Sequence, residues 1–352
     1  MATYNPSSLQ ETSLRMKKIV VIGGGTGSYT VLRGLKHYPV DITAVVSMFD
    51  SGGSSGMLRD EFGLLPPGDV RRCLVALAEE NGINILRELF NYRFKEDSSL
   101  KGHSFGNLFL TALTQIVGSE AQAIKKAGKV LNIKGQVLPV SVTNVNLRAE
   151  LEDGSIIEGE TNIDIPKHDG NLKITRIFLE PEAFILNETE QAIAEADIIV
   201  IGPGDLYTSV IPNLLVKGVS EAIQQSNAKK VYVCNIMTKW GETNGFKASD
   251  CAREVLSYIK GMEKFDAIIC SSSIASPSLL KRYEAENSFP ILLDPLLESY
   301  ADKIICEDVA MISDIIRHDS SKLSKAIIDL RFDKQETIEE PLLLARPLHN
   351  AI

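Results

Sequence analysis

The chain has 352 residues, of which 44% are hydrophobic, 24% charged and 6% aromatic, and its formal net charge is -9. This composition is ordinary for a globular α/β protein with a large core, and the acidic balance argues against an extended nucleic-acid surface. No run approaches 18 apolar residues and the first residues carry no apolar signal core, so we expect a cytoplasmic protein without a membrane span.

The first expected elements are a strand, a glycine-rich turn and a helix. Residues 1–15 are polar and aperiodic, so we expect an extension there and a single folded domain over 16–330. Residues 19–22 are apolar and β-branched, as in a buried parallel strand, and 29–36 have helical composition. The turn between them comprises Gly23, Gly24, Gly25, Thr26, Gly27 and Ser28. It would direct backbone N–H groups and a positive helix end towards one point, which suits a phosphate.

This turn departs from the dinucleotide fingerprint G-x-G-x-x-G, because Ser28 stands where the third glycine belongs. A tight structural turn without a ligand is therefore the alternative. A second strand, expected over 42–48, ends in another glycine-rich turn: Asp50, Ser51, Gly52, Gly53, Ser54, Ser55 and Gly56. Ordering so many glycines costs backbone entropy, and two such turns at neighbouring strand ends form the crevice where open α/β sheets bind ligands.

Asp50 has three candidate roles: it could bind a ribose hydroxyl, hold a metal on a diphosphate, or cap the next turn. Asp69 is expected at the N-cap of a helix over 70–80. Arg59, Arg71 and Arg72 follow the second turn closely. Their planar guanidinium groups suit a phosphate, although surface salt bridges to nearby acids are the alternative.

A further helix is expected over 83–93, and a strongly apolar one over 108–117. His103 and Asn107 precede the apolar helix in a loop flanked by glycines, as ligand-facing residues would. A lone histidine is also often only a structural hydrogen-bonding group.

Residues 137–180 change character. Apolar and polar residues alternate over 142–150, 155–161 and 173–179, with a hairpin signal at Asp153-Gly154. We expect an antiparallel insertion, a subdomain or the edge of a lid, that carries no obvious chemistry.

The α/β alternation then resumes, with strands expected over 197–201, 230–234 and 266–270 and late edge strands over 291–293 and 326–328. Polar loops follow the first three of these strands. The residues singled out in them are Gly202, Gly204, Asp205, Tyr207, Asn213, Asn235, Thr238, Glu242 and Thr243. Because the carboxyl ends of parallel strands share one edge, all of these loops are expected to line one cleft of a Rossmann-like, mainly parallel sheet flanked by helices.

Five scattered cysteines, odd in number and without a C-x-x-C spacing, are expected to be buried thiols rather than disulfides or zinc ligands. Residues 331–352 are expected to form a polar tail. Its apolar patch, 341–344, would dock on a partner subunit in a homo-oligomer.

Several segments together resemble the CofD-like superfamily and, within it, the gluconeogenesis-factor (YvcK-like) branch. They are 22–28, 50–56, 66–69, 102–107, 202–213 and 235–243. The resemblance implies a Rossmann-like fold and, in this branch, binding of a UDP-sugar, usually UDP-N-acetylglucosamine. It also implies a role in cell shape and peptidoglycan synthesis during growth on gluconeogenic carbon sources. The CofD branch instead binds GDP and, with a metal ion, transfers a 2-phospholactyl group onto the deazaflavin Fo.

The chain departs from the family pattern at three places. Ser51 replaces a second aspartate, Asp205 replaces a serine, and Lys239-Trp240 replace Gln-Pro. With one carboxylate missing beside the expected metal position at Asp50, metal-assisted transfer loses support.

The first functional hypothesis is a nucleotide-sugar-binding regulator without robust turnover, and the alternative is a transferase of a phosphate-linked group in which Asp50 holds Mg²⁺. A NAD-dependent oxidoreductase would rest only on the first turn. In the first two readings residues 23–28 bind the diphosphate, and Ser54 and Ser55 bond the nucleotide or sugar. Asn107, Tyr207, Asn213 and Thr238 would line the cleft, with Glu242 and Thr243 at its rim.

Overall fold

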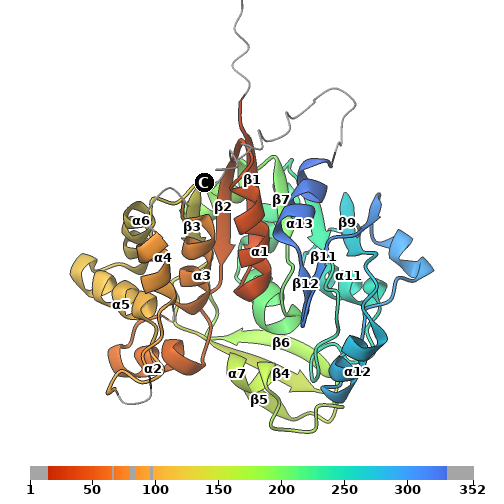
Figure 1. Cartoon of the computed structure of the whole chain (residues 1–352), viewed down its shortest axis with the longest axis horizontal. Helices are drawn as coiled ribbons and strands as arrows, with labels where there is room; N and C mark the ends of the chain where they lie inside the picture. The colour runs from red at the N-terminus through yellow and green to blue at the C-terminus, as the bar shows by residue number, and fades with distance from the viewer. Residues whose placement is uncertain (1–14, 66, 80–83, 96–97, 331–352) are drawn as a thin grey trace, which may run out of the picture.

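The protein is built around a seven-stranded sheet, and the computed structural model describes residues 15–65, 67–79, 84–95 and 98–330. The strands lie in the order β10-β9-β8-β7-β1-β2-β3, and neighbouring strands run parallel (Figure 1). Their bounds are β1 Lys17–Gly23, β2 Val40–Val46, β3 Gln136–Pro139, β7 Ile198–Ile201, β8 Lys229–Val233, β9 Ala267–Ser271 and β10 Ile304–Glu307. This is the Rossmann-like class that the apolar, β-branched runs predicted.

Helices cover both faces of the sheet, because alternate strand residues point to opposite sides and both sets are apolar. Ile19 and Val21 are buried on one face with residues of α1, α3, α6 and α13, while Val20 and Ile22 are buried on the other with residues of α8, α10 and α11. The helices of the first half are α1 Gly25–Leu35, α2 Gly53–Phe62, α3 Gly68–Leu77, α4 Asn84–Asn91, α5 Phe105–Val117 and α6 Glu120–Val130. Those of the second half are α8 Asn187–Ala194, the π-helix η1 Leu206–Val210, α9 Ile211–Leu214, α10 Val219–Gln225, α11 Ala248–Ser257, α12 Pro277–Ala285, the 3₁₀-helix η2 Pro295–Ser299 and α13 Ser320–Ile328.

The last described helix, α13, packs directly on the first, α1 (Figure 1). Ser324 Oγ donates a hydrogen bond to the Val31 carbonyl at 3.3 Å. A Cβ on Gly34 would collide with the Ser320 carbonyl, so the two helices approach each other closely only because residue 34 is glycine.

The antiparallel insertion is a three-stranded sheet in the order β5-β4-β6, with a short helix, at the lower edge of Figure 1. Its elements are β4 Asn146–Leu151, β5 Ile156–Glu158, α7 Glu160–Asp164 and β6 Ile174–Glu180. The predicted turn at Asp153-Gly154 joins β4 to β5. Residues 136–139 form β3 of the main sheet, so the antiparallel part begins later than the predicted residue 137.

Both predicted late edge strands are wrong. Residues 326–328 lie in α13, where Asp319 caps the helix by accepting bonds from the amides of Ser321 and Lys322. The apolar triplet is therefore the buried face of a helix. Residues 291–293 are irregular, and the sheet ends instead at β10, beyond which β11 Ala310–Ile312 and β12 Ile316–His318 form a separate hairpin.

The order in which the chain adds strands to the sheet reverses at β1, because β2 lies on one side of β1 and β7 on the other. Such a switch point opens a crevice outside the carboxyl ends of the strands, where ligands bind in this class of fold. The first glycine-rich turn follows β1 and therefore stands at this crevice.

Within the described residues, no helix has the length and apolar character needed to cross a membrane. Cys73, Cys234, Cys251 and Cys270 are buried free thiols, as expected. Cys306 is exposed, contrary to the expectation, because it lies on the edge strand β10. The expected docking patch at 341–344 lies outside the described residues.

Candidate functional site

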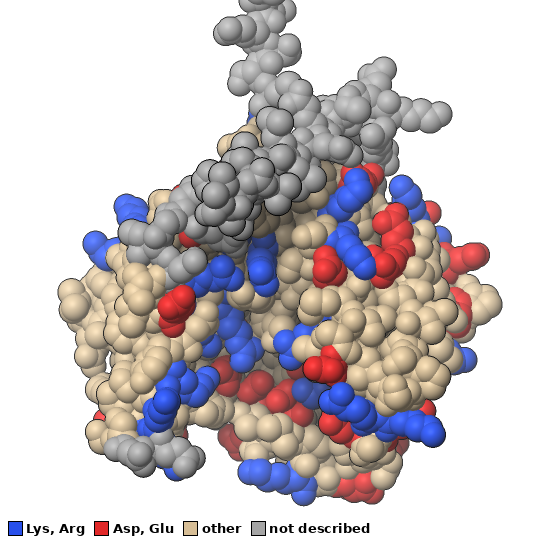
Figure 2. All heavy atoms as spheres, in the orientation of Figure 1, with Lys and Arg blue, Asp and Glu red and all other residues tan. Residues whose placement is uncertain are grey.

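A cleft of about 400 Å³ lies at the carboxyl ends of β1, β2 and β7. The predicted residues that line it are Gly24, Gly25, Thr26, Gly27, Asp50, Gly52, Gly53, Ser54, Ser55, Asp69, Arg71, Arg72, Asn107, Gly204 and Asp205. Figure 2 shows basic and acidic side chains gathered side by side around the hollow above the insertion. The convergence of glycine-rich turns that the sequence predicted is therefore present for three of the strand ends.

Three helices begin at this cleft without a side-chain cap. The N-cap residues of α1, α2 and α3 are Gly24, Gly52 and Pro67, and none of them accepts a hydrogen bond through its own side chain. Gly25 and Gly53 open α1 and α2 at φ +61° and +49°, a region that favours glycine. Since the first amides of a helix lack intrahelical partners and carry positive partial charge, the cleft is suited to an anion.

Asp69 acts at a different helix from the one predicted. Pro67 is the N-cap of α3, so Asp69 lies inside the first turn of α3, and its carboxylate accepts a hydrogen bond from the Gly25 amide of α1. Burial raises the pKa of Asp69 to about 6, against the opposing effect of Arg72, whose Nη1 lies 3.6 Å from Asp69 Oδ1. A carboxyl group thus stands at the helix end to which an anionic ligand would be drawn.

The two neighbouring arginines differ in availability. Arg71 is buried and donates to Asn107 Oδ1 at 3.0 Å, Asn91 Oδ1 at 3.0 Å and the Phe90 carbonyl at 3.3 Å. Burial, reinforced by Arg72, lowers the pKa of Arg71 to about 10. The Arg72 side chain is 46% exposed and faces the cleft, so Arg72 is the better placed of the two to meet a phosphate.

Behind the second glycine turn, four polar side chains form one network. Ser54 Oγ lies 3.2 Å from His103 Nδ1, and Asn107 Nδ2 donates to Ser54 Oγ at 3.2 Å and to Ser55 Oγ at 3.3 Å. Ser104 caps α5 by accepting from the Asn107 amide. His103 does not line the cleft, and its observed contact is the structural one that the sequence left open: it orients a serine that does.

Asp50 makes the contact of a turn cap, because its Oδ1 accepts a hydrogen bond from the Gly52 amide at 2.8 Å, and its roles at a ribose hydroxyl and at a metal stay predictions. The carboxylate still borders the cleft. Within the described residues, the one group of three acidic, His or Cys side chains close enough to share a cation does not include Asp50.

The insertion contributes the opposite wall of the cleft, through Glu160, Thr161, Asp164 and Ile165. Ser51 Oγ accepts from the Thr161 amide at 3.0 Å and donates to Thr161 Oγ1 at 3.3 Å, which ties α7 to the second glycine turn. Burial, with Asp50 and Asp164 nearby, raises the pKa of Glu160 to about 8. The insertion therefore supplies cleft-lining residues that the sequence did not indicate.

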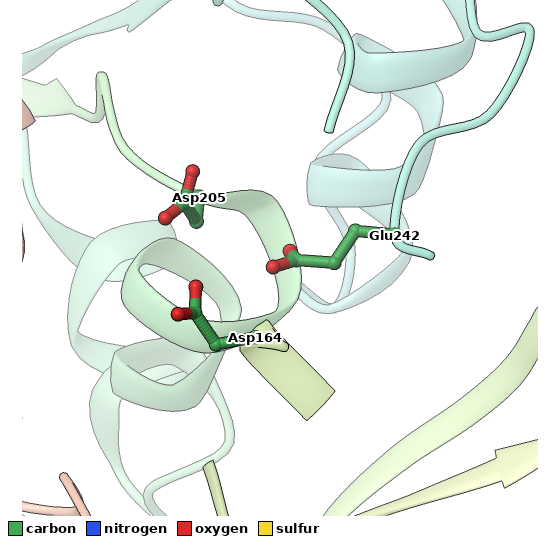
Figure 3. Close-up of side chains that lie close together, drawn as sticks. All are labelled: Asp164, Asp205 and Glu242. Carbon is green, nitrogen blue, oxygen red and sulfur yellow. The ribbon is translucent and has the colours of Figure 1, made fainter. Parts of the chain in front are cut away.

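Asp164, Asp205 and Glu242 direct their carboxyl groups towards one another from three separate segments (Figure 3). One oxygen from each lies within 4.8 Å of the others. Lys239 Nζ lies 2.5 Å from Asp164 Oδ1 and 3.1 Å from Asp205 Oδ2, so one ammonium group already pairs with two of the three carboxyl groups. The donor set itself fits a divalent cation, but the lysine stands in the way of one.

Glu242 is fully engaged by the protein. It accepts hydrogen bonds from the Tyr207 amide at 2.9 Å and from Thr208 Oγ1 at 3.2 Å, and it is 4% exposed. Burial, with Asp205 adding to its effect, raises the pKa of Glu242 to about 8.

The remaining predicted site residues do not line the main cleft. They are Gly23, Ser28, Ser51, Gly202, Tyr207, Asn213, Asn235, Thr238 and Thr243. The Tyr207 hydroxyl bonds Glu254, Asn213 donates to the Ser209 carbonyl, and Thr243 Oγ1 accepts from the Lys239 amide. These contacts hold the loops together, and a role of these residues at a ligand stays a prediction.

Asn235 has a place of its own. Its side chain bonds both the amide and the carbonyl of Gly204, and it lines a smaller hollow of about 170 Å³. Gly27 and Asp205 border this hollow as well as the main cleft, and Arg317 closes it from the β11–β12 hairpin.

Residues that the sequence analysis did not assign to the site also line the main cleft. They are Ser47, Gly68, Arg93, Glu160, Thr161, Asp164, Ile165, Thr208 and Ser209. Thr208 and Ser209 belong to the third glycine-rich loop, so the pattern could have included them. The residues of the insertion gave no local signal.

Comparisons with known proteins identify the family and match the fold. A family model described as 2-phospho-L-lactate transferase CofD matches residues 19–311. The gluconeogenesis factor of Halalkalibacterium halodurans is 45% identical over 323 residues, which are 90% of this chain and 97% of that protein. The gluconeogenesis factor of Bacillus subtilis is 42% identical over 316 residues, 89% of this chain and 98% of that protein. A crystal structure of a UPF0052 family member from Bacillus halodurans matches with a TM-score of 0.84 at 44% identity, covering 90% of this chain and all of that one.

Proposed function

The chain belongs to the CofD family and, within it, to the gluconeogenesis factors, and on this premise we propose that it is a regulatory protein that binds a nucleotide sugar of the UDP-N-acetylglucosamine type. Its role would link carbon metabolism to cell shape and peptidoglycan synthesis. The observation that carries the proposal is the meeting of three helix N-termini, those of α1, α2 and α3, at one cleft beside Arg72.

The diphosphate would bind the amides at the start of α1 and α2, where Gly25 and Gly53 leave room for close approach. Arg72 would add a charge-assisted bond. The main cleft, at about 400 Å³, falls in the range of small-molecule sites, and the adjoining hollow of about 170 Å³ extends it past Asp205. The nucleoside and the sugar would divide these two spaces.

A second candidate function is transfer of a phosphate-linked group with Mg²⁺. Carboxyl groups on the same cleft favour it, because Asp50, Asp69 and Glu160 all border the space that the diphosphate would fill. A divalent cation between these oxygens and the phosphates would offset their charge and assist the departure of a phosphate-linked group.

Isothermal titration with UDP-N-acetylglucosamine and with GDP, each with and without Mg²⁺, separates the two functions. The proposal expects binding of the UDP-sugar that is independent of Mg²⁺ and no binding of GDP. Mg²⁺-dependent GDP binding, with product formed from a phosphate-linked donor, would replace the proposal by the transferase.

The position of the diphosphate is tested by Gly25→Ala, with Gly63→Ala as the matched control. Both glycines have positive φ (+61° and +67°), but a Cβ at Gly25 would stand in the cleft between Ser209 and Arg72, whereas Gly63 has no atom within 4 Å and lies outside it. We expect Gly25→Ala to weaken UDP-N-acetylglucosamine binding by at least about tenfold and Gly63→Ala to leave it unchanged. Equal affinities in both folded variants would contradict this placement.

A further inference from the structure

Residues 159–170 of the insertion, here called the roof, cover one side of the cleft. Glu160, Thr161, Asp164 and Ile165 of the roof line the cleft directly. At its beginning the roof is fastened to the second glycine turn by the two Ser51–Thr161 hydrogen bonds. The rest of the roof is held by a second set of contacts.

The loop that follows β8, residues 239–244, supplies that second fastening. The Trp240 ring lies against Gly170, where a Cβ would collide with it, and Asn244 Nδ2 donates to the Gly170 carbonyl. Gly241 packs against Pro166 with no room for a side chain. The loop 239–244 therefore packs closely against the second half of the roof.

Lys239 makes the charged part of this contact. Its ammonium joins Asp164 of the roof to Asp205 of the third glycine turn, at 2.5 and 3.1 Å. The side chain of Lys239 is 31% exposed, and those of Asp164 and Asp205 are 28% and 41% exposed. Burial by itself would lower the pKa of Lys239, but Asp205 and Glu242 outweigh it and raise that pKa, so the ammonium stays charged.

The same ammonium occupies a position with the chemistry of a cation site. Asp164, Asp205 and Glu242 bring three carboxyl oxygens within 4.8 Å of one another from three separate segments of the chain (Figure 3). Three carboxyl oxygens at this spacing are ligands that a hard divalent cation takes, whereas here a lysine of the protein bridges two of them.

We propose that Lys239 is a positioning residue whose ammonium serves as a built-in counter-cation, holding the roof over the cleft where a divalent cation would otherwise be needed. The roof is thereby closed whether or not Mg²⁺ is present. For ligand affinity this inference rests on the proposed function, but the fastening of the roof does not.

Hydrogen–deuterium exchange of the full, unliganded chain tests the fastening. In Lys239→Met we expect peptides covering the roof to exchange about tenfold faster than in the wild type, because an ion-paired contact to the roof is lost. The matched control is Lys217→Met, which breaks the exposed ion pair of Lys217 with Glu182 away from the cleft and should leave the roof unchanged. Unaltered roof exchange in Lys239→Met would overturn the proposal.

Recovery by a metal ion separates a counter-cation from a merely structural lysine. Added MnCl₂ should slow roof exchange again in Lys239→Met, which leaves the three carboxyl groups without a cation, and should have no effect on the wild type. Lys239→Arg should keep the roof closed without metal. Failure of Mn²⁺ to restore Lys239→Met, or an equal response of the wild-type roof, would refute the counter-cation role.

If Lys239→Met does not fold, Asp164→Asn tests the same contact while Lys239 keeps its pairing with Asp205. We expect faster roof exchange with no recovery by Mn²⁺, since one carboxylate is gone, and unchanged roof exchange would overturn the proposal. Titration with UDP-N-acetylglucosamine is measured in parallel. If the wild type does not bind this ligand, the proposed function fails, while the exchange data still decide the role of Lys239.

Discussion

The loops after β1 and β2 and the loops after β7 and β8 have similar compositions but different structures. After β1 and β2, the turns lead into helices whose N-cap residues Gly24 and Gly52 offer no side-chain partner, and both turns line the cleft. The loop after β7 also reaches the cleft, through Gly204, Asp205, Thr208 and Ser209, but many polar groups after β7 and β8 bond to one another. Asn235 bonds Gly204, and Glu242 binds the Tyr207 amide.

The difference follows from side-chain length. A glycine has no side chain that could accept from a neighbouring amide, so a glycine-rich turn keeps amides free for a ligand, apart from those of Gly25 and Gly52, which bond Asp69 and Asp50. Asparagine, threonine and glutamate reach back to the backbone, and a loop rich in them satisfies itself. A polar loop after a strand therefore indicates the carboxyl-end edge of the sheet. The share of glycine in that loop indicates whether its amides stay accessible to a ligand.

The largest expected effect comes from removing Arg72, the cleft arginine that flanks the start of α1. Arg72→Ala should weaken UDP-N-acetylglucosamine binding about ten- to a hundredfold, because a charge-assisted bond to the diphosphate is lost. Arg253→Ala is the matched control, since Arg253 pairs with Asp250 at the same i,i+3 spacing as Arg72 with Asp69 but on α11, outside the cleft. Calorimetry of both variants makes the measurement, and equal losses would remove the distinction between the two regions.

The carboxyl group of Asp69, which bonds the first amide of α1, makes the stability of the protein depend on pH. The pKa of Asp69 is raised from 3.8 to about 6, so between these values the folded state binds more protons than the unfolded one. Its contribution to stability is therefore greatest at the acid end and declines as the pH rises to about 6.

Asp69→Asn should remove this slope and make the free energy of unfolding about 2 kcal/mol less pH-dependent between pH 4 and 6, because the shift spans roughly two pKa units of about 1.4 kcal/mol each. Asparagine keeps an acceptor for the Gly25 amide. Urea unfolding across that range is the measurement, and identical slopes for the variant and the wild type would show that Asp69 titrates normally. The same variant should bind the UDP-sugar slightly more tightly at pH 7, because a negative charge beside the diphosphate is gone.

The smallest expected effect concerns the loops after β7 and β8. Tyr207→Phe removes a hydroxyl that bonds Glu254 and should lower the free energy of unfolding by about 1 kcal/mol, the usual contribution of one hydrogen bond. It should leave UDP-N-acetylglucosamine affinity unchanged. A tenfold weaker affinity in a variant of normal stability would place Tyr207 in contact with the ligand after all.

The local sequence predicted much of the fold because the strands of the main sheet are short, β-branched runs that are buried on both faces. Residues 19–22, 197–201 and 230–234 lie in or overlap β1, β7 and β8. The error at 326–328 arose because three apolar residues fit a buried strand or a helix equally well. The capping aspartate, Asp319, was the signal that distinguishes them.

The site was predicted only where a glycine pattern marked it. The glycine pattern around Gly25 and Gly53 indicates the two turns that line the cleft. No local pattern near Glu160 or Asp164 indicates that these two residues lie on the opposite wall. Their position depends on how the insertion folds back over the sheet. Lys239 was visible as a departure from the family pattern, yet its partners Asp164 and Asp205 are far from it in the chain.

The packing of α13 on α1 has a consequence for the order in which the protein is made. During synthesis, α1 and the turn before it leave the ribosome early, but Ser320 and Ser324, which lie against Gly34 and Val31, follow only when almost the whole described chain has been translated. Until then the apolar side of α1 has no cover from α13. The face of α1 that α13 covers is therefore buried late, and until then its apolar residues are exposed to chaperones and to aggregation.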